Sequence, residues 1–105
     1  MIKDPNAGDE PTSDVERVDF ASMDVNPNPA KDMAVVTFKS ESNNTLTMDV
    51  YDMSGRKVAD LFQGNVEANQ VYKTDFNTSA LADGVYYIRL FSLSDQEIKK
   101  LIIAR

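Results

Sequence analysis

The sequence of 105 residues contains no cysteine, no histidine and no tryptophan. Without cysteine or histidine the chain cannot form a disulfide, a zinc site of thiolates and imidazoles, or a Ser-His-Asp or Cys-His catalytic group. No apolar run approaches the roughly 20 residues that a membrane-spanning helix needs. These absences exclude the commonest catalytic classes and leave carboxylates, lysines and tyrosines as the remaining acid/base candidates.

Acidic residues are in excess, with 17 Asp and Glu against 11 Lys and Arg and a net charge of −6. This balance argues against a phosphate-backbone partner, so we expect no nucleic acid to bind. Residues 1–24 hold seven of the acidic residues and two of the basic ones. Residues 3–14 are almost free of apolar side chains and cannot offset the entropy of ordering. We therefore predict an acidic flexible linker at residues 1–17 and one domain at residues 18–105.

Beyond the linker, apolar residues recur at every second position in short runs such as Leu46–Val50 and Tyr86–Leu90. This is the period of a β-strand and not that of an α-helix. Asn26–Pro29 is predicted to end the first strand, because proline removes a donor and restricts its predecessor. Glu97–Ala104 is interpreted as the last strand. Turn-forming pairs separate the runs at Asn43-Asn44, Ser54-Gly55, Gln63-Gly64, Asp83-Gly84 and Ser94-Asp95. The spacing predicts an all-β antiparallel sandwich.

Few residues offer site chemistry. The candidates for a paired-carboxylate hydrolase are Asp49, Asp52 and Asp83, although turn formation accounts for acidic residues beside glycine. Asn26, Asn28 and Asp32 offer oxygen ligands for calcium from one loop, but their spacing matches no EF-hand. We assign no catalytic residue, no cofactor and no metal site.

Tyr86 and Tyr87 are neighbours in one predicted strand, so their rings must point to opposite faces. Tyr87 is the one that we expect to be exposed. Lys99, Lys100 and Arg105 form a small cationic end, which is typical of a solvated strand edge.

Residues 25–105 resemble the type A C-terminal sorting domain of the type IX (Por) secretion system of Bacteroidetes. The matching segments follow the family's order: Asn26–Ala30, Val36–Phe38, Leu46–Val58, Leu81–Leu90 and Lys99–Arg105. The chain departs from the family twice. Ala68-Asn69-Gln70 stands where many members have Ala-Gly-x-His, and Phe76-Asn77 stands where many have Trp-Asp-Gly. Phe76 is expected to fill the tryptophan's place in the core.

The resemblance implies a non-catalytic, Ig-like antiparallel β-sandwich of about seven strands at the end of a larger exported protein. It implies passage through the periplasm to the outer-membrane surface or the extracellular space, with the translocon, its outer-membrane shuttle and a sortase-like peptidase as partners. Because residues 1–5 do not start a secretory signal, we expect a longer precursor with an N-terminal cargo domain. Recognition is expected at the terminal strands, at Gly84, Tyr86, Tyr87, Lys99, Lys100 and Arg105. Cleavage is expected at Asp14, Val15, Glu16 and Arg17.

Two other functions fit the same strand pattern. An Ig-like accessory or carbohydrate-binding module of a secreted hydrolase would bind polysaccharide on an exposed row of aromatic residues. A structural domain like those of the flagellar hook cap would share the Tyr-Asp-x-x-Gly-Arg stretch at residues 51–56.

Overall fold

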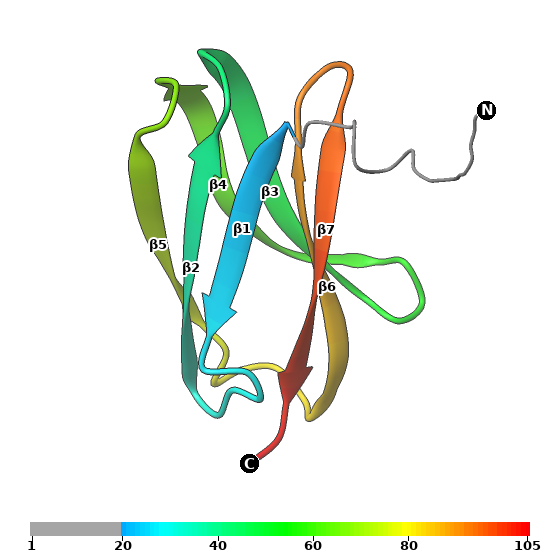
Figure 1. Cartoon of the computed structure of the whole chain (residues 1–105). Helices are drawn as coiled ribbons and strands as arrows, with labels where there is room; N and C mark the ends of the chain where they lie inside the picture. Colours follow the sequence, from blue (N-terminus) through cyan, green and yellow to red (C-terminus); the bar gives the residue numbers. More distant parts are fainter. Residues whose placement is uncertain (1–19) are drawn as a thin grey trace, which may run out of the picture.

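A computed structural model describes residues 20–105 and contains seven β-strands and no helix in this range (Figure 1). The strands are β1 (Ala21–Asn26), β2 (Met33–Ser40), β3 (Asn44–Asp52), β4 (Lys57–Val66), β5 (Val71–Asn77), β6 (Gly84–Phe91) and β7 (Gln96–Ile103). No helix that could cross a membrane occurs in this part of the chain. The predicted linker at residues 1–17 and the expected cleavage region at 14–17 lie outside the described residues. The all-β prediction is confirmed.

The strands form two antiparallel sheets packed face to face. One sheet has the order β1-β2-β5 and the other has the order β4-β3-β6-β7. In a constant-type immunoglobulin domain the fourth strand lies with the first, second and fifth, whereas here it has changed sheets. β1 and β7 are the edge strands of different sheets, and they lie side by side at one flank of the sandwich (Figure 1).

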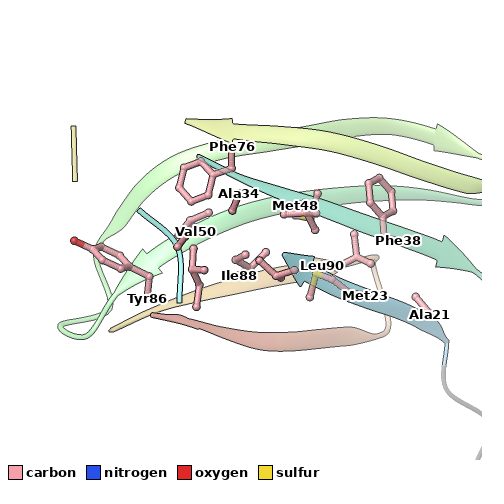
Figure 2. Close-up of a cluster of buried hydrophobic side chains, with 14 of the residues drawn as sticks. Ala21, Met23, Ala34, Phe38, Met48, Val50, Phe76, Tyr86, Ile88 and Leu90 are labelled. Atoms are coloured by element: carbon pink, nitrogen blue, oxygen red, sulfur yellow. The ribbon is translucent and has the colours of Figure 1, made fainter. Parts of the chain in front are cut away.

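The core is built from alternate residues of both sheets, as the period-two pattern predicts (Figure 2). In β3, Leu46, Met48 and Val50 are fully buried. Phe76 is 4% exposed and occupies the core, as expected for the residue that replaces tryptophan. Burying each such side chain contributes about 1.5–3 kcal/mol, so the core is the main source of stability.

β4 is where the sequence prediction was wrong. Gln63-Gly64 was predicted as a turn, but both residues lie inside β4, and Gly64 pairs with Leu46 of β3. The β3–β4 pairing shifts register twice, between Met48 and Asp49 and again before Tyr51. Each shift breaks the alternation of faces, so β4 lacks the period-two signal by which the other strands were found.

The turn before β5 contains Asn69 at the position where many members of the family have glycine. Asn69 has a φ of 63°, in the left-handed region that glycine adopts without strain. Asparagine tolerates this region better than most residues. The Asn69 backbone N–H donates to the carbonyl of Ser40 at 2.8 Å, so the turn remains tied to β2.

Candidate functional site

The terminal hairpin is formed by β6 and β7, which pair along their whole length from Gly84–Ile103 to Phe91–Gln96. β6 lies in the interior of its sheet, next to β3, and β7 is the edge strand. Gly84 begins β6 with a φ of 154°, which other residues rarely adopt, and a Cβ there would meet no atom within 4 Å. Backbone conformation, and not lack of space, therefore favours glycine here.

The two adjacent tyrosines of β6 point to opposite faces. Tyr86 is only 7% exposed, and its hydroxyl donates to the carbonyl of Ala82 at 2.7 Å. Tyr87 lies on the outer face, is 37% exposed, and pairs across the sheet with Tyr51 and Lys100. Of these two tyrosines, Tyr87 exposes part of its ring, whereas the ring of Tyr86 belongs to the core.

Arg105 binds two loops of the domain, β1–β2 and β5–β6, at its lower end in Figure 1, where the C-terminus lies. Its guanidinium donates to the carboxylates of Asp32 at 3.2 Å and Asp83 at 2.9 Å, to the Leu81 carbonyl at 2.8 Å, and to the Thr78 carbonyl. The hydrogen bond to Asp32, followed by that to Asp83, raises the pKa of Arg105. Its side chain is therefore engaged within the domain, unlike the exposed Lys99 and Lys100, which form no ion pair within residues 20–105.

The Asn-Pro-Asn-Pro segment closes part of the outer edge of β7. The Asn28 side-chain amide donates to the Lys100 carbonyl at 2.9 Å, and its oxygen accepts from the Ile102 N–H at 3.0 Å. Two residues later, Ala30 forms a parallel bridge, with its N–H donating to the Ile102 carbonyl at 2.8 Å and its carbonyl accepting from the Ala104 N–H at 2.9 Å. The amide of Asn28 thus takes the place of a backbone peptide beside β7.

The outer face of the β4-β3-β6-β7 sheet is hollowed beside this edge. A shallow depression of about 500 Å³ is lined by Tyr51, Asp52, Met53, Gly55, Tyr87, Arg89, Gln96 and Ile98. Three of its side chains are large, apolar or aromatic, and exposed: Met53 at 72%, Tyr87 at 37% and Ile98 at 51%. This depression and the edge of β7 form one continuous surface, because Gln96 and Ile98 belong to both.

A charged pair underlies the depression. Asp49 is 3% exposed, and its carboxylate lies 3.6 Å from Nε of Arg89. The Tyr51 hydroxyl donates to Asp49 at 3.1 Å and accepts from Arg89 at 2.9 Å. The guanidinium also lies over the ring of Phe91, 4.0 Å from its centroid. Among residues 20–105, Asp49 Oδ1 and Arg89 Nε have no hydrogen-bond partner. The pair is therefore held by charge, by the bridging Tyr51 hydroxyl and by the contact of the guanidinium with the rings.

The candidate carboxylates do not meet in a catalytic pair. Asp49 faces Arg89, and Asp83 binds Arg105. Asp52 accepts hydrogen bonds within its own turn, and the Ser54 hydroxyl at 2.7 Å is the main cause that lowers the pKa of Asp52. Asp52 and Asp83 line one shallow depression, and each is held by its own structural contacts.

The candidate calcium ligands also point to separate partners. The Asn26 amide donates to Asp24, the Asn28 amide binds β7, and Asp32 binds Arg105. In the described part of the chain, no group of three or more His, Cys, Asp or Glu could hold a metal ion.

The model of one protein family, the secretion system C-terminal sorting domain, matches residues 24–104. The matched range runs from β1 through the whole terminal hairpin. The chain belongs to the C-terminal sorting-domain family of the Por, or type IX, secretion system. Such a domain is a sorting signal for type IX secretion, which directs export toward the outer membrane, and the family is in general non-catalytic.

Among solved structures, this sorting domain is similar to the crystal structure of dimeric latent PorU from Porphyromonas gingivalis. The TM-score is 0.63 and the sequence identity is 19%, over 80% of this chain and 9% of that chain. At this identity the likeness shows a shared fold. No curated protein matches the chain.

Two features of the sorting domain's terminal hairpin were missed by the sequence analysis. Asn28 was considered as a cation ligand, and its contact with β7 spans 72 residues of sequence. Arg89 was not singled out at all, although it lies beneath the depression with Asp49. The sequence offered one signal for this pair: Asp49 and Arg89 both stand at positions of their strands that alternate with core residues.

Proposed function

We propose that this domain is the C-terminal signal that takes a larger cargo protein through the type IX outer-membrane translocon. The family match over residues 24–104 carries this proposal, because it includes both strands of the terminal hairpin. The partners are the translocon with its outer-membrane shuttle, and a cargo domain that precedes residue 1. Gly84, Tyr87, Lys99 and Lys100 present the hairpin to this machinery, whereas Tyr86 and Arg105 maintain its shape.

After translocation, a sortase-like peptidase removes the domain while the cargo is attached to the cell surface. We place the cut in the acidic segment 1–17, at Asp14–Arg17. The composition of this segment supports the proposal, because a polar chain with few apolar residues is the kind of site at which cleavage leaves a neighbouring core intact. Mass spectrometry of the released cargo would locate its new C-terminus, and a cut within residues 20–105 would contradict this assignment.

The export signal is tested by fusing the full chain to a periplasmically targeted fluorescent protein. We expect surface fluorescence in a strain with a working type IX system, and retention in the periplasm both when the translocon is deleted and when the fusion lacks the domain. Surface display of the fusion without the domain would refute the proposal. Removing Lys99–Arg105 is an unsuitable variant, because it deletes the fully buried Leu101 and would disrupt the core.

The two alternatives have less support. A carbohydrate-binding module would need a row of exposed aromatic residues. Within residues 20–105, Tyr87 is the only exposed aromatic side chain, and the others are half-buried or buried. The hook-cap alternative is supported only by the shared strand pattern, whereas the model of the sorting-domain family matches residues 24–104.

A further inference from the structure

The two halves of β7 differ in whether their outward backbone groups are used. In an antiparallel ladder, the N–H and C=O of one residue point to the same side, and successive residues alternate. Lys100 and Ile102 bond outward, to Asn28. Since the β6–β7 pairing has no register shift, the same alternation turns Gln96 and Ile98 outward as well.

The C-terminal half is closed, and the N-terminal half is open. From the Lys100 carbonyl to the Ala104 N–H, every outward backbone group of β7 and the residue that follows it is bonded to Asn28 or Ala30. Before that point, no hydrogen bond within residues 20–105 reaches the outward N–H and C=O groups of Gln96 and Ile98, or the N–H of Lys100. β1 lies alongside but belongs to the other sheet. Within residues 20–105, five successive outward groups are therefore unpaired and could pair with one more strand.

The side chains beside this open half favour one kind of strand. Ile98 and Tyr87 are exposed and border the outer-face depression, which suits an apolar side chain of an added strand. Lys99 and Lys100 are exposed and form no ion pair in the described part of the chain. Lysines on an edge strand disfavour pairing with other strands in general. A strand that carries an acidic residue would be attracted to these lysines, so the edge would select such a strand over others.

We propose that Gln96–Lys100 is a docking edge for an extended segment of a partner protein that carries both acidic and apolar residues. The segment adds to β7 as a further strand and rests an apolar side chain in the depression. It places one carboxylate beside Lys100 on that outer face and another beside Lys99 on the opposite face, because neighbouring side chains of a strand alternate. Asn28 and Ala30 limit the added strand to the open half, so they set where pairing stops. This inference rests on the proposed function, because the segment belongs to the export machinery.

The test uses the cargo fusion with substitutions confined to the open half. Ile98→Pro removes the central outward N–H, and proline at an outward position of an edge strand leaves the β6–β7 ladder intact. Ile98→Val is the matched control, because it keeps the N–H and a β-branched side chain. We expect Ile98→Pro to lower the surface-delivered fraction by about tenfold, and Ile98→Val by less than about twofold, since one partner carbonyl is left unpaired.

A charge reversal tests the same edge without altering its backbone. Lys99→Glu together with Lys100→Glu should also reduce delivery by about tenfold, whereas Lys73→Glu on the exposed surface of β5 should not. Thermal unfolding of each purified full chain verifies that the variants fold.

The outcomes separate this inference from the proposed function. If the unchanged fusion is not delivered, both fail. If it is delivered and the Ile98→Pro and double-lysine variants are delivered equally well, the docking edge is wrong and the export signal stands. A dimer of the purified chain that sedimentation detects and Ile98→Pro abolishes would assign the edge to self-pairing and would also overturn the proposal.

Discussion

Replacing Asn28 by alanine should loosen the end of β7 without touching the core. The change removes the hydrogen bonds from the side-chain amide to the Lys100 carbonyl and from the Ile102 N–H to the side-chain oxygen, at 2.9 and 3.0 Å. Each such bond contributes about 0.5–1.5 kcal/mol net. Because both bonds are exposed to water, which replaces part of this energy, we expect a loss of about 1–2 kcal/mol. That corresponds to a fall in Tm of about 5–10 °C for a domain of this size.

Urea unfolding followed by circular dichroism measures this loss, and an unchanged m-value would show that the native state keeps its compactness. Hydrogen exchange adds a local readout, since the Ile102 amide should exchange faster in Asn28→Ala than in the unchanged chain. Asn26→Ala is the matched control, because this neighbouring amide contacts only the exposed Asp24. The reasoning is refuted if Asn28→Ala costs no more stability than Asn26→Ala and leaves Ile102 equally protected.

Three further predictions concern the contacts that hold the ends and turns. Arg105→Lys keeps the charge but loses the planar fork, so it should lower the Tm in thermal unfolding, whereas the exposed Arg56→Lys should leave the Tm nearly unchanged. Asn69→Ala should cost about 1 kcal/mol and Asn69→Gly should not, as chemical denaturation will show; equal effects would contradict the left-handed turn. The pKa of Asp52 lies below its ordinary value of 3.8. Asp52 therefore contributes to the stability of the fold at neutral pH, and this contribution is lost as the pH falls through the folded-state pKa. Acid titrations should therefore show a smaller loss for Asp52→Asn than for the unchanged chain, and identical curves would exclude this contribution.

Most of the fold could be predicted because a strand with one face in the core alternates in its own sequence. Leu46–Val50 and Tyr86–Leu90 were recognised in this way, and both are central in the larger sheet. β4 could not be recognised, because its register shifts place neighbouring residues such as Leu61 and Phe62 at similar, intermediate burial. A bulge depends on the partner strand, so the sequence of β4 contains no local mark of it.

The candidate site was predicted in part. The opposite orientation of Tyr86 and Tyr87 follows from the geometry of any strand and is confirmed. The engagement of Arg105 was not predicted, because its partners lie on two loops that are distant in sequence. That Lys99 and Lys100 flank an open edge, and not a closed one, also depends on which segment lies beside β7.

The sequence alone determined the class of this protein. The absence of cysteine and histidine, the period of two and the ordered segments up to residue 105 are properties of the chain itself, and they led to an all-β domain of the sorting-signal family. The tertiary structure decided what the edge of β7 can do. Asn28 and Ala30 reach β7 across more than 70 residues, and the packing of β1 against β7 brings them there. From the sequence, Asn26–Pro29 could be predicted only as the end of a strand. The hydrogen bonds of Asn28 to β7 join distant segments, so they exist only once both sheets have formed.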